Sequence, residues 1–164
     1  MDHLYAPWRF EYFTSKVEGC VFCHIGKNRN DDKELGVLFR DTHCFGVMNR
    51  YPYTPGHFMI IPNHHTDAIE SLDEATWMQM SLHVQSGVKM LKEGFGAFGV
   101  NIGMNLGQDA GAGIAEHVHY HLVPRWGRDT NFITSIGGAR VYGIEFEKIY
   151  TDLKLLVPTY FQLS

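Results

Sequence analysis

Three histidines at alternate positions, His117, His119 and His121, are the strongest chemical signal in this chain of 164 residues. In an extended strand, side chains two residues apart lie on one face, so these imidazoles would form a row while the residues between them face the core. A neutral imidazole that a carbonyl orients through Nδ1–H keeps its Nε2 lone pair and can attack phosphorus. The resulting covalent phosphoramidate divides one displacement into two easier steps. The spacing therefore predicts nucleophilic chemistry at a phosphoryl group.

A glycine-rich loop over residues 105–113 directly precedes these histidines. Glycines let backbone N–H groups approach an anion closely, as in a phosphate-binding nest. We expect the backbone at Gly111, Gly113 and Ile114 to supply such donors. The loop matches neither a P-loop nor a dinucleotide-binding fingerprint, so its position beside the histidines is what indicates phosphate binding.

The three cysteines indicate a metal site rather than a disulfide framework, because their count is odd and only Cys20 and Cys23 are close in sequence. A C-x-x-C spacing supplies half of a tetrahedral zinc site. The sequence has no second C-x-x-C pair, so histidines would have to complete the site. The alternative is that both thiols are buried beneath the N-terminal segment without a metal.

The composition is that of one globular domain over residues 1–164, with 45% hydrophobic and 20% charged residues. We divide it into an N-terminal segment, residues 1–35, which holds the cysteine pair, and a core over residues 36–164. The net charge of −4 excludes a broadly basic protein that binds nucleic-acid polymers or membrane surfaces. The apolar runs are too short to span a bilayer and no leader opens the chain, so we expect a cytoplasmic protein.

The pattern of apolar and turn residues predicts an α+β fold: an antiparallel sheet meander with one long helix packed across it and a C-terminal helix. The strands are expected over residues 37–40, 44–49, 57–61, 97–104 and 116–124. The charged run over residues 26–34 is expected to be a solvated loop. The C-terminal helix is expected over residues 145–155.

The long helix is predicted to begin at a capping box, in which Ser71 and Glu74 satisfy free N–H groups of the first turn. It is expected to end at Gly94 and Gly96. Its buried face is predicted from the residues that recur at spacings of three and four: Trp77, Ser81, Val84, Val88, Leu91 and Phe95.

The sequence His-Val-His-Tyr-His-Leu-Val, residues 117–123, matches the signature of the histidine-triad family. The chain resembles this family over nearly its whole length, particularly the fragile-histidine-triad branch and the bacterial branch similar to diadenosine tetraphosphate phosphorylase. The resemblance implies cleavage of a phosphoanhydride in a dinucleoside polyphosphate through a nucleotidyl-histidine intermediate. The segments that carry it, besides the cysteine pair, are residues 4–9, 49–62, 103–107 and 124–127.

The resemblance also assigns roles to single residues. His119 matches the nucleophile, and the backbone carbonyl of His117 would orient its ring. His121 matches a donor to phosphate oxygens, and His57 matches a fourth histidine that supports the triad. Three side chains match contacts to the nucleotide, the first to ribose hydroxyls and the others to phosphate: Asn49, Asn105 and Gln108. Four histidines keep no assigned role and are expected at the surface or in local hydrogen bonds: His3, His24, His43 and His83.

Several bacterial relatives hold zinc with two cysteines, the first triad histidine and a histidine shortly after the proline that ends the third strand. In this sequence the ligands would be Cys20, Cys23, His65 and His117, with His64 as the adjacent rival of His65. The ion would be structural and would fix the triad strand. The resemblance further implies a homodimer, and Mg²⁺ could accompany the substrate polyphosphate.

One departure from the family pattern leaves the acceptor open between water and inorganic phosphate. Gly113 and Ile114 stand where many members have Gln-Ser or Gln-Thr, so a side-chain donor to the transferred phosphate is missing. Two other functions are alternatives. One is a nucleoside phosphoramidase, against which Asn49 argues because that branch commonly has Asp there. The other is a nucleotide-binding regulatory module with little catalysis.

Overall fold

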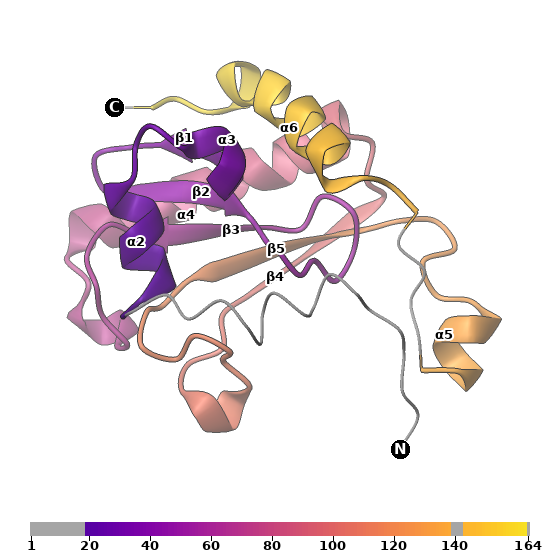
Figure 1. The fold of residues 1–164 in the computed structure, drawn as a ribbon, viewed down its shortest axis with the longest axis horizontal. Coiled ribbons are helices and arrows are strands. Elements are labelled where there is room, and N and C mark those ends of the chain that lie inside the picture. Colours follow the sequence, from indigo (N-terminus) through magenta and orange to yellow (C-terminus); the bar gives the residue numbers. More distant parts are fainter. Residues whose placement is uncertain (1–18, 139–142, 164) are drawn as a thin grey trace.

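The computed structural model describes residues 19–138 and 143–163, so residues 4–9 of the family resemblance lie outside the described part. Within these residues the chain forms one antiparallel sheet with helices on both faces (Figure 1). The strands are β1 (Val37–Arg40), β2 (Cys44–Met48), β3 (Phe58–Pro62), β4 (Gly99–Gly103) and β5 (Tyr120–Arg125).

The strands lie in the order β1-β2-β3-β5-β4, and neighbouring strands are antiparallel. The predicted α+β class, the antiparallel sheet and the long helix across it are therefore confirmed. The meander covers β1 to β3. The chain then crosses one face of the sheet as helix α4 (Glu74–Lys89) and returns at the outer edge as β4, so that β5 inserts between β3 and β4.

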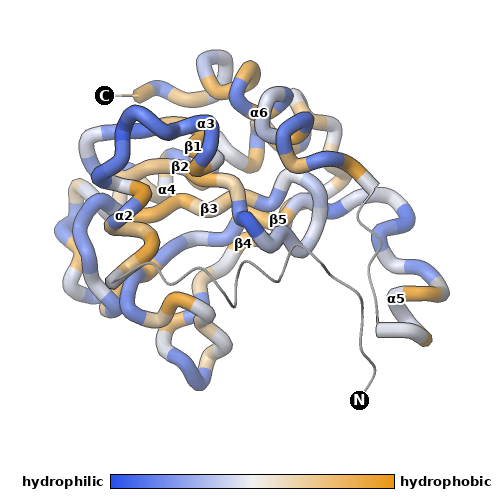
Figure 2. Tube along the Cα trace, viewed as in Figure 1, coloured by the Kyte–Doolittle hydropathy of each residue, from blue (hydrophilic) through white to orange (hydrophobic). Residues whose placement is uncertain are grey.

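Both faces of the sheet are covered, which explains why β2 and β3 are buried along their whole length. Because side chains alternate along a strand, Phe58 and Ile60 belong to the core under α4 and α6 (Phe146–Tyr160), whereas Met59 and Ile61 pack with α2 (Val21–Lys27). Figure 1 shows α2 on one side of the sheet and α4 on the other, and Figure 2 shows hydrophobic colours along β3 between them.

Helix α4 begins later than the predicted capping box. Asp73 is the N-cap, and its carboxylate accepts a hydrogen bond from the Thr76 backbone N–H at 2.9 Å. Ser71 instead ends a short 3₁₀-helix, and its hydroxyl donates to the carbonyl of Ala68 at 2.8 Å. The capping-box prediction is wrong because serine and aspartate are comparable N-caps, and the preceding turn already uses the serine hydroxyl.

The buried face of α4 is shifted by about one residue from the predicted stripe. Gly87 explains the shift: a Cβ there would lie 2.6 Å from Leu122 and 2.8 Å from Phe58, so glycine lets the helix approach the sheet closely. The prediction followed the spacing of three and four, and four residues of that stripe are only half-buried: Trp77, Ser81, Val88 and Phe95. The buried positions through the end of the helix are Thr76, Met80, His83, Val84, Gly87, Met90 and Leu91.

Several element boundaries also differ from the sequence prediction. The charged run 26–34 is not all loop, since α3 (Asp32–Leu35) begins within it. Residues 116–119 lead into the sheet in irregular backbone, so β5 begins at Tyr120. After β5 comes a short helix, α5 (Phe132–Ile136). Among the helices of the described residues, none is both long and apolar enough to cross a membrane.

Candidate active site and metal centre

His119 is held with its Nε2 lone pair free. Its Nδ1 lies 2.8 Å from the carbonyl oxygen of His117, and because a carbonyl only accepts, Nδ1 carries the proton. The side chain is 6% exposed, and the ring of Phe22 from α2 packs against it with centroids 4.9 Å apart. Burial lowers the pKa of His119, although the hydrogen bond to His117 opposes this effect. The ring is therefore neutral at pH 7, which is the nucleophilic form of imidazole.

A chain of hydrogen bonds fixes the tautomers of His57 and His121. The backbone N–H of Tyr53 donates to His57 Nδ1 at 3.2 Å, so His57 carries its proton on Nε2. His57 Nε2–H then donates to His121 Nδ1 at 2.9 Å, which places the His121 proton on Nε2. The His119 and His121 ring centroids are 4.7 Å apart. A nucleophilic nitrogen and an N–H donor thus stand side by side.

Burial keeps the two supporting imidazoles uncharged at neutral pH. His57 is fully buried, and this burial, followed by the positive charges that His121 and His119 would carry, lowers its pKa to about 3. Burial also lowers the pKa of His121 to about 4, with His119 adding to the effect. The pair consequently donates hydrogen bonds as neutral rings and adds no fixed positive charge beside His119.

A cavity of about 1290 Å³ opens beside these rings. His119 and His121 line it, whereas His57 and His117 do not, so the four histidines do not share one environment. The six residues predicted to bind the substrate all line this cavity: Asn49, Asn105, Gln108, Gly111, Gly113 and Ile114.

The glycine-rich loop forms part of the cavity wall around a short 3₁₀-helix (Gln108–Ala110). Gly107 and Gly111 flank that helix with φ of +85° and +89°, the left-handed region that favours glycine. Asn105 donates from Nδ2 to the Gly111 carbonyl at 3.5 Å, which ties the two ends of the loop together. The Gly111 backbone N–H donates to the Gln108 carbonyl at 2.9 Å, so the expectation that Gly111 supplies a free donor is wrong, because the turn itself uses that N–H. Gly113 and Ile114 also line the cavity, next along the chain.

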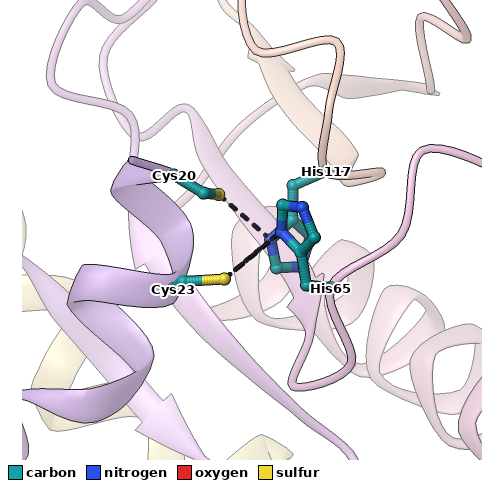
Figure 3. A group of neighbouring side chains, drawn as sticks. All are labelled: Cys20, Cys23, His65 and His117. Carbon is teal, nitrogen blue, oxygen red and sulfur yellow. Dashed lines mark hydrogen bonds between the residues drawn. The ribbon is translucent and has the colours of Figure 1, made fainter. Parts of the chain in front are cut away.

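The predicted metal ligands Cys20, Cys23, His65 and His117 converge in the structure (Figure 3). One ligand atom from each residue lies within 4.8 Å of all the others. The Cys20 thiol is 3.3 Å from His117 Nδ1, and the Cys23 thiol is 3.3 Å from His65 Nδ1. The two Nδ1 atoms are 3.3 Å apart.

The geometry of this Cys/His cluster fits a tetrahedral zinc ion. Zinc bonds of about 2.0 Å to nitrogen and 2.3 Å to sulfur place neighbouring ligand atoms roughly 3.3–3.8 Å apart. Four sulfur–nitrogen and nitrogen–nitrogen separations in the cluster run from 3.3 to 3.8 Å. His117 Nε2 donates to the Pro62 carbonyl at 3.0 Å, so its Nδ1 lone pair points into the cluster. His64 is not among the converging residues, which distinguishes it from His65.

Sequence reasoning missed three aromatic residues of the cavity and one buried histidine. Phe22, Tyr51 and Tyr53 line the cavity, and only the position of Phe22 between the two cysteines was a signal for this. His83 was expected at the surface or in a local hydrogen bond, but it is 2% exposed and lies 2.8 Å from the buried carboxylate of Asp41. Its spacing of three from Met80 and four from Gly87 on α4 was the available signal.

Comparison with known proteins identifies the family. A family model described as the HIT domain matches residues 30–127, which is more than half of the chain. The chain is 41% identical over 169 aligned residues to the AP-4-A phosphorylase of Mycobacterium tuberculosis, an alignment that covers 97% of this chain and 84% of that protein. The protein therefore belongs to the HIT, or histidine-triad, family.

Two further similarities are more distant. The chain is 27% identical over 93 residues to the bis(5'-adenosyl)-triphosphatase of Dictyostelium discoideum, covering 57% of this chain and 62% of that protein. Among solved structures, a zinc-bound histidine triad family protein from Mycobacterium smegmatis superposes with a TM-score of 0.70 at 26% identity, covering 86% of this chain and 94% of that chain.

Acidification from pH 7 to pH 5 should destabilise the protein through His57. In the unfolded chain histidine takes up a proton near pH 6.5, whereas the folded pKa of about 3 keeps His57 neutral. The unfolded state therefore binds more protons as the pH falls, and this residue alone removes about 2 kcal/mol of stability by pH 5. Urea unfolding of the wild type and His57→Gln at both pH values measures the effect. The variant should lose less stability, and an equal loss in both proteins contradicts the prediction.

Proposed function

We propose that this protein transfers a nucleoside monophosphate from a dinucleoside polyphosphate, such as diadenosine tetraphosphate, through a covalent intermediate on His119. The observation that carries the proposal is the fixed tautomer of His119, whose Nδ1–H donates to the His117 carbonyl, in a residue that lines the cavity. A site that only bound nucleotide would need no oriented, neutral imidazole there. The 41% identical relative named AP-4-A phosphorylase supports the same substrate class.

In this mechanism His119 Nε2 attacks the α-phosphorus, and the nucleoside polyphosphate leaves with its bridging oxygen. His121 donates its Nε2–H to a phosphoryl or leaving-group oxygen, and His57 holds His121 in that orientation. Backbone N–H groups of the loop at Gly113 and Ile114 stabilise the charge that develops on the phosphoryl oxygens. Asn49 contacts the ribose, and Asn105 and Gln108 contact the phosphates. Mg²⁺ would accompany the polyphosphate chain of the substrate.

Inorganic phosphate is the proposed acceptor that discharges the intermediate. The cavity wall at Gly113 and Ile114 offers no side-chain hydrogen-bond donor, which leaves room for a second anion beside the nucleotidyl group. Attack by phosphate breaks the phosphorus–nitrogen bond and releases a nucleoside diphosphate. The bis(5'-adenosyl)-triphosphatase relative supports water as the second candidate, which would release a nucleoside monophosphate.

His119→Gly should reduce turnover of diadenosine tetraphosphate by more than about 1000-fold, as expected for loss of a nucleophile. With phosphate present, the wild type should yield ATP and ADP, whereas a hydrolase would yield ATP and AMP. Product analysis by anion-exchange chromatography, with and without phosphate, measures both results.

The matched control is His64→Ala, because His64 is exposed and lies in neither the cavity nor the Cys/His cluster. It should retain wild-type turnover. Wild type quenched with alkaline denaturant should carry labelled nucleotide as a phosphoramidate, which is stable to alkali and lost in acid. Full turnover by His119→Gly overturns the proposal. A wild type that shows neither turnover nor trapped label also overturns it and favours the regulatory binding module.

We also propose that the Cys/His cluster holds one zinc ion. The support is the convergence of two thiols and two Nδ1 atoms at tetrahedral spacing, together with the zinc-bound structural relative. When bound, such an ion supplies structural cross-linking, because all four positions are occupied by protein ligands. His117 links the cluster to His119, since one residue provides both a ligand nitrogen and the carbonyl that orients the nucleophile.

Protein purified without chelator should contain one zinc per chain, and Cys20→Ser and His65→Ala should lose it. His64→Ala is the matched control and should keep the metal. Elemental analysis gives the stoichiometry, and calorimetry should give a lower Tm for the two metal-free variants, because a structural zinc ion contributes directly to folding. A metal-free wild type that is fully folded and active would contradict the zinc proposal.

The homodimer implied by the family resemblance is proposed to form along β4. This strand is an edge of the sheet, and Ile102 on it is 49% exposed. The opposite edge at β1 is capped by α6, where Lys154 donates to the carbonyls of Val37 and Leu38. An open edge is a template for pairing with another chain.

Ile102→Lys should therefore shift the protein from dimer to monomer, because it places a charge on the proposed apolar contact. Leu155→Lys is the control, since Leu155 is exposed on α6 far along the chain from β4. Sedimentation equilibrium measures the mass of each protein. A wild-type monomer, or an Ile102→Lys dimer of unchanged affinity, contradicts the proposed interface.

A further inference from the structure

Aromatic rings flank the two cavity histidines at opposite ends. Phe22 packs on His119, with ring centroids 4.9 Å apart. Tyr53 packs on His121, with centroids 6.0 Å apart and ring planes only 25° from parallel. His119 and His121 contact each other between them. The ring contacts therefore run in the order Phe22, His119, His121, Tyr53, with the two histidines in the middle.

Tyr53 differs from Phe22 in its exposure to solvent. Phe22 is 2% exposed and belongs to the core beneath α2, whereas Tyr53 is 55% exposed although it lines the same cavity. One side of the Tyr53 ring lies against His57 and His121. An aromatic ring that is supported on one face and open on the other is the arrangement that stacks nucleobases.

The size of the cavity indicates that one nucleotide does not fill it. Pockets for single small ligands measure about 300–1000 Å³, whereas this cavity measures about 1290 Å³. In a dinucleoside polyphosphate whose phosphoanhydride lies over His119 and His121, the two nucleosides would extend in opposite directions. One nucleoside would lie toward the apolar wall at Phe22 and the other toward Tyr53.

We propose that the outer face of Tyr53 is the stacking platform for the base of the leaving nucleoside, so that Tyr53 makes the site prefer substrates with two nucleosides. This inference rests on the proposed function and adds a subsite to it. Tyr53 is suited to the role because its backbone N–H is already fixed by His57 Nδ1, which holds the loop in place whatever the side chain does. Its ring therefore adds binding contact without serving as a hydrogen-bond partner in the histidine chain.

The test compares two non-cleavable ligands: a methylene-bridged diadenosine tetraphosphate and the matching adenosine tetraphosphate, which lacks the second nucleoside. Isothermal titration calorimetry gives the Kd of each for wild type, Tyr53→Ala and Tyr53→Phe. Tyr53→Ala should weaken the two-base ligand by roughly 5- to 150-fold, the equivalent of one base–aromatic stack, and leave the one-base ligand unchanged. Tyr53→Phe should bind both ligands as the wild type does. Leu155→Ala is the control, because Leu155 is exposed on α6 and does not line the cavity.

Two results would overturn the inference. Equal weakening of both ligands by Tyr53→Ala means that the ring only supports the histidines, and no weakening of either means that no base stacks there. Because Kd is measured without cleavage, a failure of the His119 turnover experiment leaves this comparison readable. A wild type that binds neither ligand would refute the proposed function and this subsite together.

Discussion

The hydrogen bond from His119 Nδ1–H to the His117 carbonyl is the interaction on which the site depends. It decides which ring nitrogen keeps its lone pair, and it requires the His117 peptide to stay in one orientation. The His117 side chain secures that peptide twice, through Nε2–H to Pro62 and through Nδ1 to the cysteine cluster. The position of the nucleophilic nitrogen therefore follows from how well one neighbouring residue is anchored.

The sheet makes this anchoring possible because it is buried on both faces. Because side chains alternate along β3, Ile60 packs in the hydrophobic core under α4, and Ile61 packs in the smaller hydrophobic core under α2. The first turn of α2, with Cys20 as its N-cap, places Cys20 and Cys23 in the Cys/His cluster and Phe22 against His119. Packing, ligand convergence and desolvation of the nucleophile consequently come from a single helix on a single face.

The departures from the sequence prediction share one physical cause. Local sequence patterns were the basis of three predictions: the capping box, the buried stripe of α4 and the exposure of His83. In the structure the close approach of α4 to the sheet is set by the small residue Gly87, and His83 is buried because Asp41 from another element neutralises the cost of burial. Contacts between distant segments decided these features, and no local pattern encodes them.

The sequence by itself determined the family signature, the α+β class, the alternate spacing of the three histidines and the glycine-rich loop before them, because these depend on strand periodicity and on residue type. It also indicated the cysteine pair as half of a metal site. Only the tertiary structure decided the rest: that His65 rather than His64 converges with the cysteines, that His57 Nε2–H meets His121, and that Tyr53 lies beside both. These are relations between strands, loops and helices far apart in the chain. They exist only once the two faces of the sheet have been packed.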